Sequence, residues 1–143
     1  MADQPDGWGP RDGRPRVLIE GHDGSITWAQ QRVLEDAGYG VRSCPGPHDL
    51  PGKRCPLVTD GRCALVEGTD AILTSLRSND PGERCVLEAL ATRDGAPPVA
   101  IEVTPASGER LDAVIDAFWQ IRAPMSKDGM LSTMNRMIEE GAR

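Results

Sequence analysis

Short apolar segments alternate along the chain with segments in which apolar residues recur every three to four positions. The apolar segments predict five buried β-strands, at residues 16–20, 39–43, 70–76, 97–105 and 117–122. The segments between several of them have the spacing of amphipathic helices. Because strands and helices alternate and are joined by short links, the pattern predicts an α/β domain with a five-stranded parallel sheet covered by helices on both faces.

Residues that favour helix ends stand near the start of each predicted helix. Ser25 is a good N-cap for the first helix, which Gly38 would end, and Asp80, Ser107 and Ser126 are suited to cap the later ones. Apolar residues at helical spacing are expected to face the core, among them Ile26, Leu34, Val86, Leu87, Leu90, Met130, Met134 and Met137. The methionines are interpreted as core residues and not as a cofactor site.

Composition and charge narrow the function classes. The 143 residues suit one domain, with residues 1–15, rich in Pro, Gly and charge, expected to form a flexible tail before a domain at residues 16–143. Asp and Glu outnumber Lys and Arg by 22 to 16, which argues against a nucleic-acid surface. No apolar run approaches the roughly 20 residues that cross a bilayer. We therefore expect a cytoplasmic protein that does not bind membranes.

The most unusual segment is "CPGPHDLPGKRCPLVTDGRCALVEG", residues 44–68, whose four prolines and four glycines oppose a continuous helix. It contains Cys44, Cys55, Cys63 and His48, and Cys85 lies on the next predicted helix. Three interpretations stay open: a zinc or iron–sulfur site, thiols that only fill space in the core, or a reversible disulfide. The spacings lack the C-x2-C knuckles of common metal frameworks.

The last part of the chain, "IRAPMSKDGMLSTMNRMIEEG", resembles the end of response-regulator receiver domains, in which Lys-Pro-Phe precedes a Ser-capped final helix. The resemblance covers roughly residues 16–140 and implies a flavodoxin-like (CheY-like) fold. Pro124 matches the receiver proline, which is commonly cis. The segment 44–68 would replace the second receiver helix with a Cys/Pro/Gly-rich loop.

The resemblance also implies where phosphorylation residues should stand. Receivers hold Mg²⁺ with an acidic pair after the first strand and accept phosphate on an Asp that ends the third, helped by a Thr and a Lys. The corresponding positions here are Gly21, His22, Ser75, Thr104 and Ala123, of which only Thr104 keeps the expected group. We therefore expect a pseudo-receiver: a regulatory, non-enzymatic signalling module that is not phosphorylated on Asp and needs no cofactor. Such a module would bind a protein partner or form a homodimer, usually through the side of the fourth and fifth strands.

The loop after the first strand supports a rival interpretation. "EGHDGSIT" opens a helix, where backbone N–H groups attract anions, and offers hydroxyls as a flavin-phosphate loop would. It also resembles the Asp-x-His-x-x-Gly motif of cobalamin-binding domains, in which the histidine binds cobalt. Here Glu20 replaces the Asp, His22 stands at the histidine position, and Gly24 comes one residue early. A small flavin- or cobalamin-binding domain is thus a further alternative.

Overall fold

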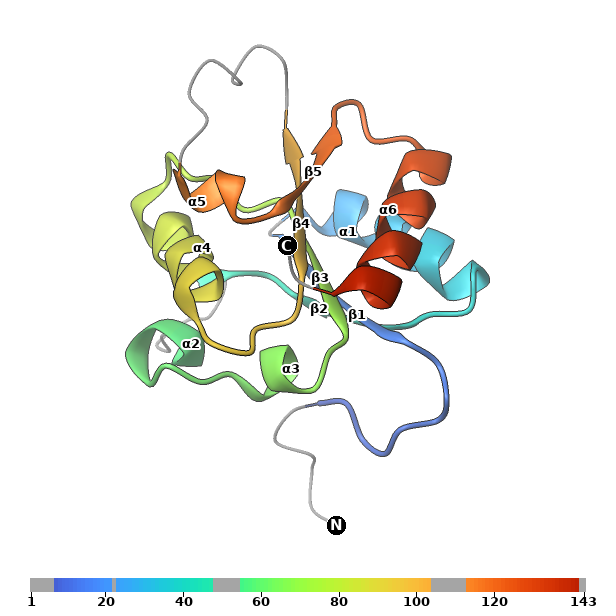
Figure 1. Cartoon of the computed structure of the whole chain (residues 1–143), viewed down its shortest axis with the longest axis horizontal. Coiled ribbons are helices and arrows are strands. Elements are labelled where there is room, and N and C mark those ends of the chain that lie inside the picture. The colour runs from blue at the N-terminus through green and yellow to red at the C-terminus, as the bar shows by residue number, and fades with distance from the viewer. Residues whose placement is uncertain (1–6, 22, 48–54, 104–112, 142–143) are drawn as a thin grey trace.

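The computed structural model describes residues 7–21, 23–47, 55–103 and 113–141. Five parallel strands form one sheet in the order β2-β1-β3-β4-β5. The strands are β1 (Arg16–Glu20), β2 (Gly40–Cys44), β3 (Ala71–Thr74), β4 (Val99–Val103) and β5 (Trp119–Arg122). The helices are α1 (Gly24–Asp36), α2 (Pro56–Thr59), α3 (Ala64–Glu67), α4 (Pro81–Thr92), α5 (Ala113–Asp116) and α6 (Lys127–Glu140) (Figure 1). This is the predicted α/β architecture of the flavodoxin-like type.

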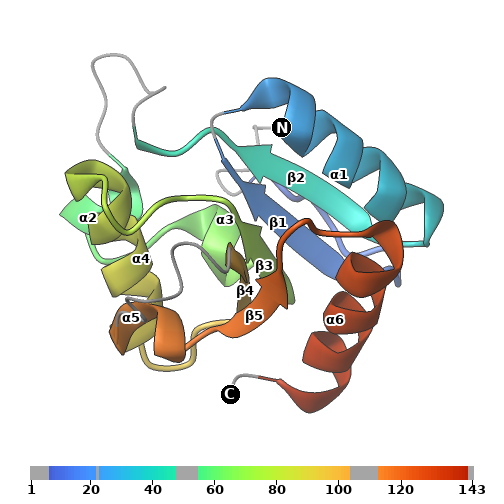
Figure 2. The ribbon, with the colours of Figure 1, turned by 90° about the horizontal axis from the view of Figure 1, so that it is seen from above.

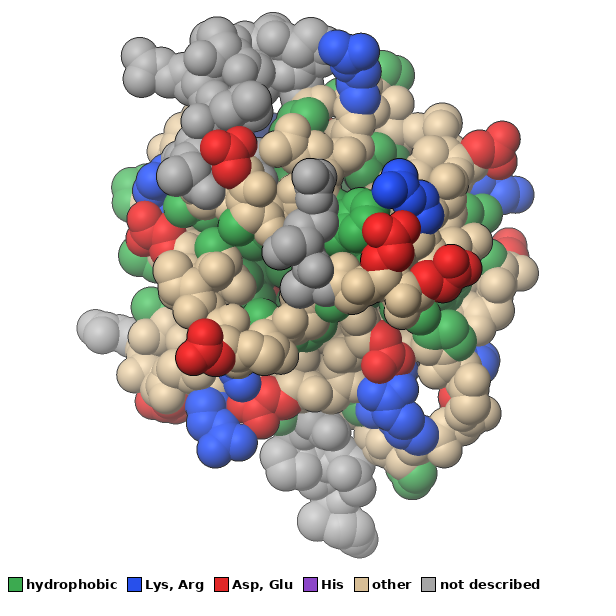
Figure 3. All heavy atoms as spheres, in the orientation of Figure 1, with side chains coloured by type: hydrophobic (Ala, Val, Ile, Leu, Met, Phe, Trp, Pro, Cys, Tyr) green, Lys and Arg blue, Asp and Glu red, His purple; other side chains and the backbone are tan. Residues whose placement is uncertain are grey.

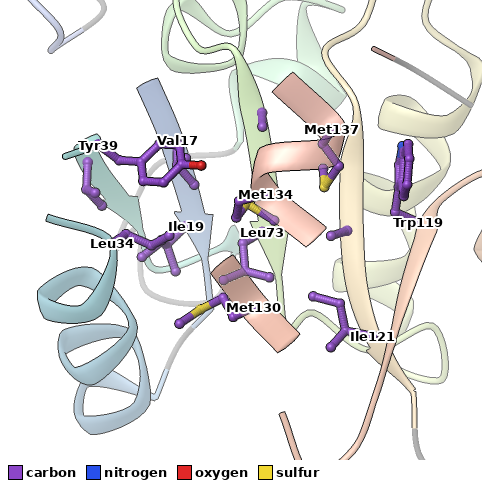
Figure 4. Packing of buried hydrophobic residues seen from close by; sticks show 13 residues of the cluster. Val17, Ile19, Leu34, Tyr39, Leu73, Trp119, Ile121, Met130, Met134 and Met137 are labelled. Atoms are coloured by element: carbon purple, nitrogen blue, oxygen red, sulfur yellow. The ribbon is translucent and has the colours of Figure 1, made fainter. Parts of the chain in front are cut away.

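The sheet separates two layers of helices. Figure 2 shows α1 and α6 on one side of the sheet and α2, α3, α4 and α5 on the other. Side chains alternate along each strand, so Val17 and Ile19 enter the core beneath α1 and α6 whereas Leu18 enters the opposite core. The predicted methionine stripe Met130, Met134 and Met137 is buried in the first of these cores (Figure 4).

Helix capping follows the sequence at two of the predicted positions. The Asp80 carboxylate accepts a hydrogen bond from Glu83 N, and the Ser126 hydroxyl accepts one from Gly129 N. Ser25 was the wrong cap for α1, because Asp23 lies two residues earlier and its carboxylate accepts from Ser25 N and Ile26 N. Ile26 was also wrongly assigned to the core: it is 49% exposed, and Thr27 occupies the buried position beside it.

The segment between β2 and β3 carries two one-turn helices where a receiver would have one longer helix. Cys55 is the N-cap of α2 and Cys63 is the N-cap of α3. Leu57 of α2 and Val66 of α3 are buried in the core beneath them. The segment is therefore anchored by a few apolar side chains; His48 lies outside the described residues.

The N-terminal segment differs from the expected flexible tail over its described residues. Trp8 is buried against the α2–α5 side, and its indole N–H donates to Leu65 O at 2.9 Å. The guanidinium groups of Arg16 and Arg42 both lie over its ring. Arg11 is paired with Asp70 at 2.8 Å. These contacts hold the described residues of the N-terminal segment against α3 and the start of β3.

Two further predictions are only partly within the described chain. Of the helix expected to start at Ser107, the structure describes only the part that forms α5, because residues 104–112 lie outside the described residues. Within the described ranges, no helix is both long and apolar enough to cross a membrane.

Candidate functional site

The candidate site lies at the carboxyl edge of the sheet, where β1 and β3 are neighbours. Their register pairs Glu20 with Thr74, so the next residues, Gly21 and Ser75, emerge side by side. Ser75 N donates to Glu20 O at 2.9 Å, and the Ser75 hydroxyl donates to the same oxygen at 3.3 Å. The structure thus brings together the two positions that in receivers hold an acidic residue and the phosphoacceptor.

Gly21 lies directly against Ser75. A Cβ atom on Gly21 would lie 2.3 Å from Ser75 Oγ and 3.3 Å from a methyl carbon of Thr27. In its present rotamer the Ser75 hydroxyl therefore occupies the volume that a side chain at position 21 would need. A residue larger than glycine at this position requires the hydroxyl to rotate away and leave its bond to Glu20 O.

The described residues at this edge do not fit a magnesium ion. Gly21 has no side chain, Ser75 offers a hydroxyl already bonded to a backbone carbonyl, and the Asp23 carboxylate is used to cap α1. The Glu20 carboxyl at the end of β1 is buried, and no three His, Cys, Asp or Glu side chains of the described residues are grouped so that they could hold a metal ion. Magnesium in phosphoryl-transfer sites is held through carboxylates and phosphate oxygens. We therefore assign no chemical step to a magnesium ion at the described part of this edge. His22 and Thr104, the other two matched positions, lie outside the described residues.

The position of the receiver lysine lies after β5. Ala123 N donates to Val103 O at 2.8 Å, which continues the pairing of β5 with β4. The Ala123–Pro124 peptide is cis, as the sequence comparison with receivers predicted. Glu102 of β4 accepts a hydrogen bond from Met125 N at 2.8 Å and so holds the turn after the proline. A methyl group at Ala123 cannot contact phosphate as a lysine would.

One titratable group at this edge, Glu20, was given no role by the sequence beyond the cobalamin comparison. It is 4% exposed, and its Oε1 has no hydrogen-bond partner in the described part of the chain. Burial raises the pKa of Glu20 from 4.5 to about 7, and a hydrogen bond from the Thr74 side chain opposes only part of that change. An acidic residue ending an otherwise apolar strand is the signal that could have identified it.

Three of the four cysteines named as candidate site residues are partly buried on the same side of the sheet. Cys44 ends β2, and with Cys55 and Cys63 it is partly buried against the core beneath α2, α3 and α4. Burial raises the pKa of the Cys44 thiol to about 11, and the neighbouring Glu20, Cys55 and Cys63 add to the increase. We call Cys44, Cys55 and Cys63 the thiol cluster. All four cysteines are free thiols, and Cys85 is exposed on α4, outside the cluster.

The metal-site interpretation has no preformed geometry in the described ranges. There, no three His, Cys, Asp or Glu side chains are grouped so that they could hold a metal ion. His48, the proposed additional ligand, is not among the described residues. The flavin and cobalamin interpretations also stay predictions, since His22 is not described.

A surface pocket lined by charged groups lies away from this edge. It has a volume of about 300 Å³ and is lined in part by Glu67, Asp70 and Arg93, near the amino end of β3. Glu67 is paired there with Arg93 at 2.9 Å. None of the sequence-predicted site residues lines this cavity.

Comparison with known proteins supports the fold. No family model and no curated protein sequence matches the chain. Among solved structures, a response regulator receiver domain from Clostridium thermocellum matches with a TM-score of 0.67 at 14% identity, over 87% of this chain and 94% of that one. A CheY-like receiver domain from Methanospirillum hungatei JF-1 matches with a TM-score of 0.64 at 19% identity, over 90% of this chain and 96% of that one. The chemotaxis response regulator CheY4 of Vibrio cholerae matches with a TM-score of 0.63 at 18% identity, over 87% of this chain and 98% of that one.

Proposed function

We propose that this chain, which has the fold of response-regulator receiver domains, is a pseudo-receiver that acts by binding protein and does not accept a phosphoryl group on aspartate. The observation that carries the proposal is the Gly21–Ser75 contact at the carboxyl edge of β1 and β3. A phosphoacceptor needs a carboxylate nucleophile and a cation beside it. Here the acceptor position holds a hydroxyl bonded to Glu20 O, and the adjacent position is a glycine, which supplies no carboxylate.

The side of the fourth and fifth strands is the docking surface that we favour. β5 is an edge strand that pairs only with β4 in the sheet, and Gln120 and Arg122 point outward from it. On the face drawn in Figure 3, acidic and basic side chains are interspersed and do not form one patch of a single sign. Mixed charge suits a protein partner or a second copy of the chain better than a nucleic acid.

Phosphorylation is tested directly with a small phosphodonor. The purified protein is incubated with acetyl phosphate and Mg²⁺, and its intact mass is measured before and after acid or hydroxylamine treatment. We expect no acyl-phosphate adduct. A stoichiometric adduct that hydroxylamine removes would overturn the proposal, and a known receiver domain treated in parallel serves as the positive control.

Docking is tested by changing charge on the proposed surface. Arg122→Glu reverses an exposed charge on β5, and Arg32→Glu makes the same change on the exposed side of α1. Sedimentation velocity of each variant measures self-association, and cross-linking of tagged full chain in its host identifies partners. We expect Arg122→Glu to weaken the dimer or the identified complex at least tenfold while Arg32→Glu leaves it unchanged. Equal effects of the two variants would contradict the assignment to β5.

A further inference from the structure

The thiol cluster is assembled from three separate elements. Cys44 comes from the end of β2, Cys55 from the N-cap of α2 and Cys63 from the N-cap of α3. All three pack against the same hydrophobic core. Cys55 and Cys63 each contribute to the raised pKa of Cys44, and Cys63 contributes to that of Cys55. The fold therefore places thiols from three elements against one core, although no three His, Cys, Asp or Glu side chains of the described residues are grouped closely enough to hold a metal ion.

Capping does not explain why cysteine stands at these positions. Neither the Cys55 nor the Cys63 side chain makes a capping hydrogen bond, although both occupy N-cap positions. Ser, Thr, Asp and Asn are the residues that usually satisfy the first N–H groups of a helix. Packing alone could equally be supplied by Ala or Val, which carry no reactive group.

A second observation shows that this region is not a simple apolar filling. The Glu20 carboxyl is almost fully buried next to the cluster, and its Oε1 is without a hydrogen-bond partner in the described chain. The electrostatic influence of Glu20 reaches both Cys44 and Cys55. A buried, incompletely bonded acid costs stability. Its presence beside three thiols is more readily explained if the region has a chemical role.

We propose that Cys55 and Cys63 form a reversible disulfide when the protein meets an oxidised low-molecular-weight disulfide, so that the segment between β2 and β3 responds to the thiol redox state. This inference goes beyond the proposed function and does not depend on it. Cys55 and Cys63 are the favoured pair because seven residues lie between them and only a turn, with Gly61 at a positive φ of 74°, joins their short helices. Cys44 is held at the end of a strand, and burial raises the pKa of its thiol to about 11.

The reaction is an ordinary thiol–disulfide exchange. The thiolate of one cysteine attacks a sulfur of the oxidant RSSR, which forms a mixed disulfide and releases RS⁻. The second cysteine loses its proton and attacks the protein sulfur of that mixed disulfide, which releases a second RS⁻. The two protons end on the released thiols. The protein pair loses two hydrogens and two electrons, and the oxidant is reduced to two molecules of RSH.

The disulfide would act on α2 and α3, each of which is a single helical turn. Leu57 and Val66 anchor α2 and α3, and α2 packs against α4. Tying the N-caps of α2 and α3 together restricts the open states of this segment. We expect the amide hydrogens of α2 and α3 to exchange about tenfold more slowly in the oxidised protein.

The test uses the full chain, purified without oxygen, in buffers of oxidised and reduced glutathione. Intact mass and peptide mapping report the disulfide, and hydrogen exchange reports the segment. Cys55→Ser and Cys63→Ser remove the proposed pair, whereas Cys85→Ser removes the exposed thiol of α4 and is the matched control. We expect wild type and Cys85→Ser to lose two hydrogens and to show a Cys55–Cys63 cross-linked peptide, reversibly with reductant, and both other variants to show neither.

Several outcomes would overturn the proposal. These are the absence of the cross-link in folded wild type, a disulfide that uses Cys85, and a glutathione adduct that is never resolved by a second cysteine. If the serine variants fail to fold, the thiols of the wild-type protein are alkylated under native conditions before and after oxidation. Loss of alkylation at Cys55 and Cys63 after oxidation supports the disulfide, and unchanged alkylation overturns it. One tightly bound zinc per chain that protects Cys55 and Cys63 would also overturn it and would assign the cluster to metal binding.

Discussion

Replacing the buried carboxyl of Glu20 with a carboxamide should remove a large part of the pH dependence of stability. The pKa of Glu20 is about 7 in the folded protein and 4.5 as the ordinary value. The folded state therefore keeps its proton over a pH range in which the unfolded state has released it. Stability falls as pH rises from about 4.5 to about 7, and this group has no further effect above that range.

The magnitude follows from the same difference. Each pKa unit corresponds to about 1.4 kcal/mol, so the difference of 2.5 between the values of about 7 and 4.5 corresponds to about 3 kcal/mol. The side chain is almost fully buried, so solvent does not screen the effect. By pH 5 part of this loss has already occurred, so between pH 5 and pH 8 the Glu20→Gln variant should lose about 2.5 kcal/mol less than wild type.

Urea denaturation at half-unit steps from pH 5 to pH 8 measures this difference. Asp116→Asn, which removes an exposed carboxyl on α5, is the control and should follow the wild-type curve. A constant offset from the buried carboxamide cancels, because only the change with pH is compared. Parallel stability curves for Glu20→Gln and wild type would refute the assignment of a raised pKa to Glu20.

Three other substitutions test the packing by urea denaturation at fixed pH. Gly21→Ala should destabilise the protein by about 1–3 kcal/mol because its Cβ collides with Ser75 Oγ, and adding Ser75→Ala should recover part of the loss; no recovery would show that the contact is not the cause. Met134→Ala should cost about 2–5 kcal/mol because Met134 is fully buried on the face of α6 that packs on the sheet, and a cost under 1 kcal/mol would contradict that burial. Trp8→Ala should cost about 3 kcal/mol through lost burial and the lost bond to Leu65 O, whereas a freely moving tail would give no change.

Local pattern was sufficient where neighbouring residues carry the physical cause. β1 was predicted at its observed bounds because five consecutive residues are buried on both faces, which reads as an apolar run. The caps Asp80 and Ser126 were predicted because a cap and the N–H that it accepts lie three residues apart. The cis peptide before Pro124 agreed with the receiver resemblance.

Local pattern was insufficient where two neighbouring residues were equally suited to the same structural role. Asp23 and Ser25 are both good caps, and the structure uses the earlier one. With that start of the helix, Ile26 is exposed and Thr27 is buried. The expectation of a tail at residues 1–15 followed from composition, which cannot show that Trp8 is buried with the guanidinium groups of Arg16 and Arg42 over its ring.

By itself, the amino-acid sequence determined the five strands, the helices α1, α4 and α6 and the parallel α/β class, because these depend on local spacing and residue type. The tertiary structure decided which polar groups meet. Pairing of β1 with β3 brings Gly21 against Ser75 across more than fifty residues of chain, and the alternation of side chains directs Glu20 toward the thiol cluster. These contacts arise from strand register and burial, which join segments distant in sequence and which no local pattern records.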